Sequence, residues 1–116
     1  MHIVVAEDNK EEAGRLGQWL TSLGHEVSFV DSGPAAIERC LTIRPGAALI
    51  DLRISGLHGF EVARRIQSWV PLIVAITSLR SMAADEVARA TGFKAFLRKP
   101  YTLDDLRSVL TPAGGT

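Results

Sequence analysis

Three features are missing from this sequence: an excess of one charge, a pair of cysteines and a long apolar run. The 13 basic residues balance the 13 acidic ones, which leaves no net charge at pH 7. A neutral chain does not attract nucleic acid, so we expect no direct nucleic-acid binding. The longest apolar stretch, WVPLIVAI at 69–76, is far shorter than the roughly 20 residues of a membrane span, so we expect no membrane insertion.

The single cysteine, Cys40, cannot form an intrachain disulfide and fits a reducing compartment. We expect it to pack as a small hydrophobic residue on one wall of a helix. Only five residues separate Met1 from Glu7, too few for the apolar core of a signal peptide. These features predict a cytoplasmic protein.

The composition, 47% hydrophobic and 22% charged, is typical of a globular chain and excludes intrinsic disorder. A chain of 116 residues buries roughly two-thirds of its unfolded surface in one core. No repeat or linker divides the sequence. We therefore predict one domain over 1–112 and a frayed tail over 113–116.

Short apolar runs alternate with helical patterns five times. The strand candidates are rich in Val, Ile and Phe and lie at 2–6, 26–30, 47–50, 72–76 and 94–97. A stretch with helical spacing of apolar residues follows each of them. Five such units with short connections predict an α/β fold: an open, doubly wound parallel sheet with helices on both faces.

The first and fourth expected helices have distinctive sequences. Asn9 offers an N-cap for the first helix and Glu12 its capping-box partner. The fourth helix, MAADEVARA at 82–90, would bury mainly alanine. Its expected inner face consists of Ala83, Ala84, Val87 and Ala88. So little buried apolar area predicts the least firmly held helix of the fold.

Polar side chains directly follow four of the strands. They are Glu7 and Asp8 after the first strand, Asp51 after the third, Thr77 and Ser78 after the fourth, and Arg98 and Lys99 after the fifth. Ligands of doubly wound sheets bind beyond these strand ends. Two like charges 4 Å apart repel by about 4 kcal/mol at an effective dielectric near 20, so one lysine cannot balance three carboxylates. The cluster predicts a divalent cation with oxygen ligands, and Mg²⁺ suits it.

A carboxylate beside Mg²⁺ can act as a nucleophile toward a phosphoryl group, which would give an aspartyl phosphate at Asp51. Lys99 can pair with the phosphoryl oxygens, and the Thr77 hydroxyl can donate a hydrogen bond to another.

The whole chain resembles a response regulator receiver domain of two-component signalling, the CheY-like family. The resemblance rests on EDN at 7–9, LIDLRISGLHGFEV at 49–62, AITS at 75–78 and GFKAFLRKPY at 92–101. It implies the strand order 2-1-3-4-5. It also implies a phosphoprotein that accepts its phosphoryl group from a histidine kinase or a histidine phosphotransfer domain and is not a turnover enzyme.

The resemblance assigns roles to single residues. Asp51 would be the phosphoacceptor and a metal ligand. Asp8 would bind Mg²⁺ directly, and Glu7 would bind it directly or through water. The backbone carbonyl of Arg53 would complete the protein ligands.

The same resemblance implies a switch. Thr77 and Lys99 would grip the phosphoryl group, Phe96 would be the switch aromatic, and the Lys99–Pro100 bond would be cis. Phosphorylation would alter a partner surface formed by the fourth helix, the fifth strand and the fifth helix. The basic residues in KAFLRKP argue against a tight dimer through this face, so we expect a monomer or a weak dimer.

The sequence departs from the family at two positions of the loop after Asp51. Ser55 stands where proline is usual, and His58 where an acidic residue is frequent. We expect His58 at the surface, at the start of the third helix, because a Mg²⁺ site favours oxygen ligands. Arg53 and Leu79 occupy places that influence the lifetime of the phosphoryl group in the family.

Other functions are weighed against this one. A phosphohydrolase with an aspartyl nucleophile generally carries a second acid two residues later, and Arg53 occupies that place. A receiver fold that binds a partner without phosphorylation is a second alternative. A flavodoxin-like nucleotide carrier would need a glycine-rich or hydroxyl-rich loop after the first strand, which this sequence lacks.

Overall fold

The computed structural model describes residues 1–111. All five strands and five helices expected from the sequence are present in the expected order. The strands are β1 (His2–Ala6), β2 (Glu26–Val30), β3 (Ala47–Asp51), β4 (Leu72–Thr77) and β5 (Ala95–Arg98). The helices are α1 (Lys10–Ser22), α2 (Gly33–Ile43), α3 (Gly59–Ile66), α4 (Met82–Ala90) and α5 (Leu103–Leu110). The predicted frayed tail, 113–116, lies outside the described residues.

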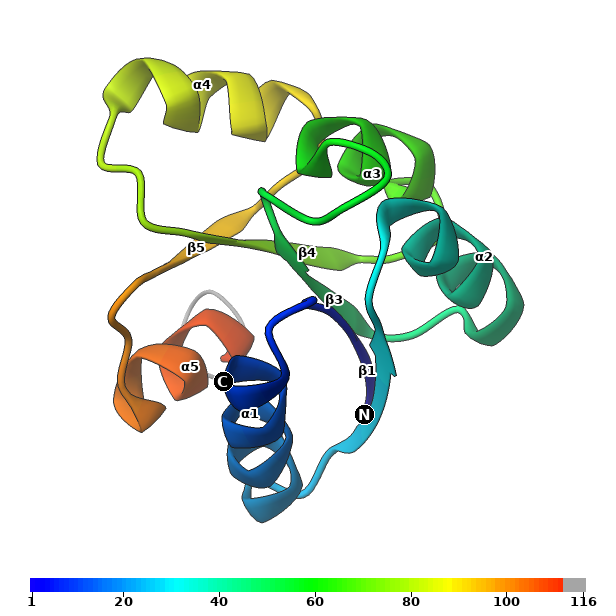
Figure 1. Ribbon diagram of the computed structural model, residues 1–116, viewed down its shortest axis with the longest axis vertical. Coiled ribbons are helices and arrows are strands. Elements are labelled where there is room, and N and C mark those ends of the chain that lie inside the picture. Colours follow the sequence, from blue (N-terminus) through cyan, green and yellow to red (C-terminus); the bar gives the residue numbers. More distant parts are fainter. Residues whose placement is uncertain (112–116) are drawn as a thin grey trace.

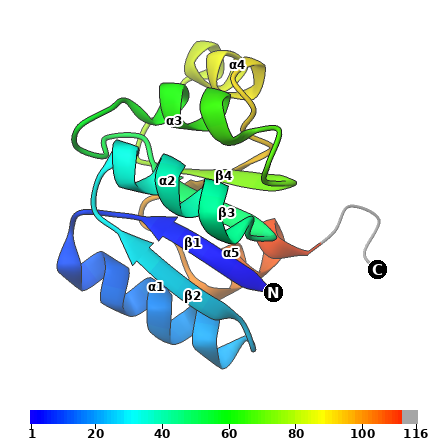
Figure 2. The same cartoon turned by 90° about the vertical axis from the view of Figure 1, so that its right-hand side faces the viewer.

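The strands form one parallel sheet in the order β2-β1-β3-β4-β5, which confirms the predicted topology. Helices α1 and α5 cover one face of the sheet, and α2, α3 and α4 cover the other (Figures 1 and 2). Among the described residues, no helix has the length and apolar character needed to cross a membrane.

Two cores hold the layers together, one on each face of the sheet. Alternate residues of β1 point to opposite faces. Ile3 and Val5 pack in the core that contains Leu16 of α1 and Leu106 of α5. Val4 and Ala6 pack in the other core. That second core also contains Cys40, Val62, Ile66 and Ala88. The sheet is thus covered on both faces.

The capping box predicted at the start of α1 is wrong in one half. The Asn9 side chain accepts a hydrogen bond from the Glu12 amide at 3.0 Å, as an N-cap does. The Asn9 amide, however, donates to the Glu7 carboxylate at 3.1 Å. The Glu12 carboxylate instead pairs with Lys99. A nearby ammonium attracts the Glu12 carboxylate more strongly than a neutral amide does.

The inner face predicted for α4 is also partly wrong. Ala88 is buried, but Ala83 and Val87 are exposed. The helix is rotated so that Asp85 faces the sheet, where it pairs with Arg98 of β5. An ion pair therefore replaces part of the apolar contact that the alanine pattern suggested.

Candidate functional site

The predicted metal and phosphate residues meet at one edge of the sheet. Asp51 and Thr77 are the last residues of β3 and β4, while Glu7 and Lys99 directly follow β1 and β5. Because the strands are parallel, these ends lie side by side. They open into a cleft of about 330 Å³. Its lining consists of Glu7, Asp8, Asn9, Glu12, Asp51, Arg53, Thr77, Ser78 and Lys99.

Asp51 is a buried carboxylate with a partner on each oxygen. The residue is 5% exposed. Its Oδ1 accepts a hydrogen bond from the Arg53 amide at 2.8 Å, and its Oδ2 accepts one from Lys99 Nζ at 2.9 Å. These two bonds, one of them charge-assisted, offset the loss of water around the carboxylate.

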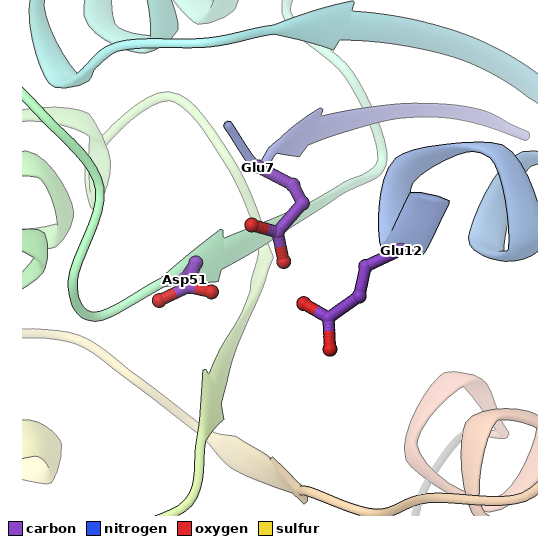
Figure 3. A group of neighbouring side chains, drawn as sticks. All are labelled: Glu7, Glu12 and Asp51. Carbon is purple, nitrogen blue, oxygen red and sulfur yellow. The ribbon is translucent and has the colours of Figure 1, made fainter. Parts of the chain in front are cut away.

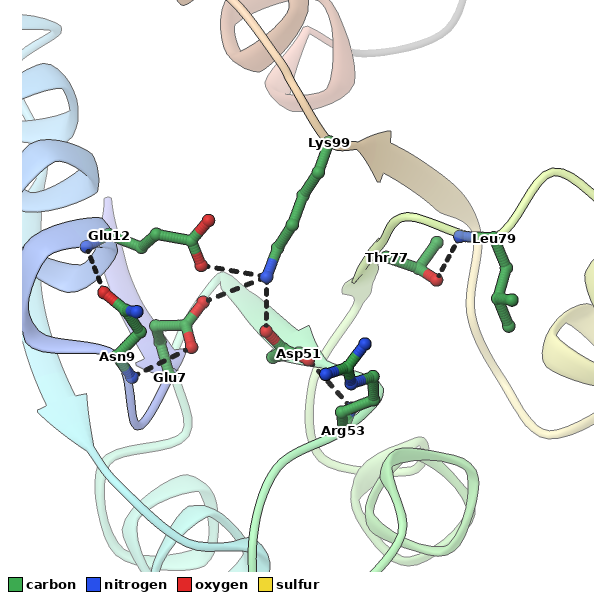
Figure 4. Close-up of polar contacts among 8 residues, drawn as sticks. All are labelled: Glu7, Asn9, Glu12, Asp51, Arg53, Thr77, Leu79 and Lys99. Atoms are coloured by element: carbon green, nitrogen blue, oxygen red, sulfur yellow. Dashed lines mark hydrogen bonds and ion pairs between the residues drawn. The ribbon is translucent and has the colours of Figure 1, made fainter.

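The Lys99 ammonium lies among three carboxylates (Figure 4). Its Nζ is 2.8 Å from Glu12 Oε2, 2.9 Å from Asp51 Oδ2 and 3.8 Å from Glu7 Oε1. Burial alone would lower the pKa of Lys99, but the hydrogen bonds to Glu12 and Asp51 outweigh it and raise that pKa above its usual value. Lys99 therefore stays charged and serves as the internal counterion of the cluster.

Glu7 is the carboxylate of this cluster whose ionised form is disfavoured by its surroundings. Burial, together with the neighbouring Glu12 and Asp51, raises the pKa of Glu7 to about 8. Glu7 Oε1 is buried and has no hydrogen-bond partner among the described residues, and Lys99 at 3.8 Å is beyond hydrogen-bond range. An unsatisfied buried oxygen of this kind suits a cation ligand, since a cation would favour the ionised carboxylate.

Carboxylate oxygens of Glu7, Glu12 and Asp51 all lie within 4.8 Å of one another, and the three side chains point into the same space (Figure 3). This set could hold a metal ion. It includes Glu12 and leaves out Asp8, which lines the same cleft as an exposed residue and stays a predicted ligand. Glu12 was not predicted in the site. Its place in the first turn of a helix that starts beside the strand ends is the signal that could have found it.

Glu12 also has a perturbed pKa. Burial would raise it, but hydrogen bonds with Lys99 and Glu7 outweigh burial, so the pKa of the Glu12 carboxyl is lowered. The glutamate closest to Lys99 thus carries the negative charge, while the more buried Glu7 holds its proton more tightly.

Thr77 and Phe96, the two predicted switch residues, lie on the neighbouring strands β4 and β5. The Thr77 hydroxyl accepts a hydrogen bond from the Leu79 amide at 3.0 Å, at the start of the connection to α4. Phe96 lies outside the cleft lining, half-buried against the core beneath α2, α3 and α4. The guanidinium groups of Arg89 and Arg98 flank its ring, 5.0 and 4.9 Å from the centroid.

The loop between β3 and α3 departs from the family pattern yet is fastened to its neighbour. The Ser55 hydroxyl donates to the Asp31 carbonyl at 3.0 Å, and the Ser55 carbonyl accepts from the Gly33 amide at 2.8 Å. His58 is exposed, and its ring caps α3 by accepting from the Phe60 amide at 3.1 Å. The surface position predicted for His58 is confirmed. So is the cis Lys99–Pro100 bond.

The family model for the response regulator receiver domain matches residues 3–111 of this chain. The chain belongs to that family. It is a receiver domain of two-component signalling, and the buried carboxylate at the end of β3 fits the phosphoacceptor role. Receiver domains work with histidine kinases and downstream effectors.

Curated relatives of this receiver domain are longer proteins. The transcriptional regulatory protein TcrA of Mycobacterium tuberculosis is 30% identical over 91% of this chain and 43% of its own length. The sensor histidine kinase AtsR of Burkholderia thailandensis is 29% identical over 96% of this chain and 19% of its own. The receiver domain thus spans less than half of either relative.

Solved receiver domains have the same fold. The receiver domain of sensor histidine kinase PA1611 from Pseudomonas aeruginosa, with a magnesium ion coordinated in its active site cleft, has a TM-score of 0.83 and 27% identity over 94% of this chain and 93% of its own. The activated receiver domain of RstA from Klebsiella pneumoniae has a TM-score of 0.87 over 95% of each chain, and at 24% identity it supports the fold alone.

Proposed function

We propose that Asp51 accepts a phosphoryl group from the phosphohistidine of a histidine kinase or histidine phosphotransfer domain, with Mg²⁺ in the cleft. The observation that carries this proposal is the placement of Asp51: a buried carboxylate, 2.9 Å from Lys99 Nζ, beside a Glu7 oxygen that has no hydrogen-bond partner in the described part of the chain. A nucleophile, a cation to pair with the phosphoryl oxygens and a ligand set for a metal lie together.

The residues at the cleft fit Mg²⁺. Glu7, Asp8, Asp51 and the backbone carbonyl of Arg53 would hold the ion, all through oxygen. The buried Glu7 Oε1, which has no hydrogen-bond partner within residues 1–111, supports this fit. When bound, the ion neutralises charge on the phosphoryl oxygens. The magnesium ion in the cleft of the PA1611 receiver domain agrees with the proposal.

The chain's own groups supply the rest of the transfer. A carboxylate oxygen of Asp51 forms a bond to phosphorus as the phosphorus–nitrogen bond of the donor breaks, and the electron pair returns to the imidazole nitrogen. The products are an aspartyl phosphate and a histidine. Lys99 would turn from Asp51 to the phosphoryl oxygens, and the Thr77 hydroxyl would donate to another. The domain modifies only its own carboxylate, so we propose that it is not a turnover enzyme.

The change would then reach a partner surface on α4, β5 and α5. When the Thr77 hydroxyl turns to the phosphoryl group, the Leu79 amide loses its acceptor, and the connection to α4 is released. Phe96 would turn inward into the vacated space. We propose that a downstream protein reads this surface and that the domain acts in the cytoplasm as a monomer or weak dimer, with no nucleic-acid contact of its own.

Phosphorylation of single-residue variants tests the acceptor. Incubated with acetyl phosphate and Mg²⁺, the wild-type domain is expected to gain the mass of one phosphoryl group, and Asp51→Asn is expected to gain none. Asp31→Asn is the matched control, because Asp31 also follows a parallel strand but lies outside the cleft lining. Phosphate uptake by Asp51→Asn would refute the assignment. A wild-type domain that binds neither Mg²⁺ nor beryllofluoride would favour a module that works without phosphorylation.

A further inference from the structure

Glu12 is a charged side chain in the site to which the proposed transfer gives no role. It lies in the first turn of α1, and its carboxylate is 2.8 Å from Lys99 Nζ. Asp51 Oδ2 is 2.9 Å from the same nitrogen. Lys99 is therefore shared between the proposed acceptor on β3 and a carboxylate on α1, as Figure 4 shows.

We propose that Glu12 is a positioning residue with two effects on the cleft. It holds the Lys99 ammonium on the α1 side as a clamp, and its negative charge strengthens the binding of a cation and weakens the binding of a phosphoryl group. This inference rests on the proposed phosphoacceptor function. It concerns how tightly the site takes each of its two ligands.

The clamp follows from the donors of the ammonium group. A lysine ammonium has three N–H donors, and Asp51 and Glu12 engage two of them at 2.9 and 2.8 Å. A phosphoryl oxygen on Asp51 must compete with Glu12 for Lys99. Without the Glu12 charge, Lys99 loses a partner on the α1 side and is freer to turn toward the phosphoryl group.

The effect on charge has opposite signs for the two ligands. Oxygens of Glu12, Glu7 and Asp51 lie within 4.8 Å of one another. At this separation the negative charge of Glu12 attracts a divalent cation and repels an incoming anion. Removal of that charge alone should therefore lower the affinity for the cation and raise the affinity for the anion, whereas damage to the site would lower both affinities.

The Glu12→Gln variant isolates this charge. The Asn9 cap uses the backbone amide of residue 12, so the start of α1 is retained. Glu11→Gln is the matched control, because Glu11 lies in the same helical turn, is exposed and lies outside the cleft lining. Both substitutions remove the same charge from the helix N-terminus, and only one removes it from the cleft.

Two affinities test the inference: Mg²⁺ for the free domain, and beryllofluoride at saturating Mg²⁺, both by calorimetric titration. In Glu12→Gln we expect Mg²⁺ to bind about threefold to tenfold more weakly and beryllofluoride to bind more tightly by a similar factor. Glu11→Gln should change neither affinity by more than about twofold. The inference is overturned if both affinities of Glu12→Gln move in the same direction, or if the two variants behave alike.

The clamp can be measured without Mg²⁺. The chain has three lysines, Lys10, Lys94 and Lys99, so the side-chain ammonium signals in a ¹H–¹⁵N spectrum are assignable with Lys10→Arg and Lys94→Arg. We expect a protected Lys99 signal in the wild type and Glu11→Gln, and its loss in Glu12→Gln. An unchanged signal in Glu12→Gln refutes the clamp. If the wild type binds neither ligand while the Lys99 signal depends on Glu12, the proposed function fails and the clamp stands.

Discussion

Arg98 of β5 and Asp85 of α4 form an ion pair that joins the helix to the edge of the sheet. The side chains are only 22% and 18% exposed, and Arg98 also donates a hydrogen bond to the Leu79 carbonyl just before α4. Ala88 is the one α4 residue that is buried. Since apolar burial contributes so little, this pair holds much of α4 against the sheet.

Asp85→Asn should therefore loosen α4 selectively. Loss of a charged, largely buried partner costs about 1 to 2 kcal/mol. Amides of 82–90 are expected to exchange with deuterium about five- to thirtyfold faster, while those of α1 remain unchanged. Asp104→Asn removes an exposed partner of Arg107 in α5 and is the control. Equal exchange of α4 in both variants would contradict the tether.

This ion pair illustrates which features the sequence could and could not predict. Apolar runs specified the five strands, and polar residues after those runs specified Glu7, Asp51, Thr77 and Lys99 in one cleft. Helical spacing alone did not determine the rotation of α4, because the choice between Val87 and Asp85 depends on Arg98, which lies on another element. The sequence assigned Glu12 to the cap of α1 because its other partner, Lys99, also lies on a distant part of the chain. A side chain with two possible partners is settled by the tertiary fold, which brings Lys99 within 2.8 Å of it.

Two glycines of the α1 region should respond oppositely to alanine. Gly14 lies inside α1, and no atom of the described residues is within 4 Å of an added Cβ, so Gly14→Ala is expected to stabilise the domain by up to about 1 kcal/mol. Gly24, just after the helix, has a φ of 92°, and Gly24→Ala should destabilise it by about 1 to 2 kcal/mol. Urea unfolding compares the two. If Gly14→Ala destabilised the domain, an added Cβ at position 14 would have to collide with a neighbouring group, contrary to the open space around Gly14.

The buried thiol of Cys40 should make stability depend on alkaline pH. Burial raises the pKa of Cys40 from 9.0 to about 12. The folded state therefore favours the neutral thiol. The resulting contribution to the free energy of unfolding is fully present below pH 9 and is lost as the pH rises from 9 toward 12.

Comparison of the wild type with Cys40→Ala isolates this effect, since all other titrating groups are shared. The wild type should be more stable by about 1 kcal/mol at neutral pH, because alanine leaves a small void in the core. Above pH 9, the difference should shrink by at most about 1.4 kcal/mol per pH unit. Urea unfolding of both proteins between neutral pH and pH about 10.5 measures it. A difference that stays constant with pH would show that the thiol ionises as freely in the folded state as in the unfolded chain.

Lys99→Met should make the domain depend on Mg²⁺ for stability. Methionine keeps much of the apolar stem of lysine but removes the ammonium that contacts Glu12 and Asp51. Without Mg²⁺ we expect a loss of about 2 kcal/mol, because the carboxylates lose their internal counterion.

Saturating Mg²⁺ should stabilise Lys99→Met more than the wild type. The proposed ion would bind the folded state only, and in the variant it would no longer compete with an ammonium for the same carboxylates. The measurement is the rise in melting temperature on adding Mg²⁺, with Lys94→Met as the control, since Lys94 is exposed and lies outside the cleft lining. A smaller rise in melting temperature for Lys99→Met than for the wild type would mean that Lys99 stabilises the metal-bound site and does not compete with the cation for the carboxylates.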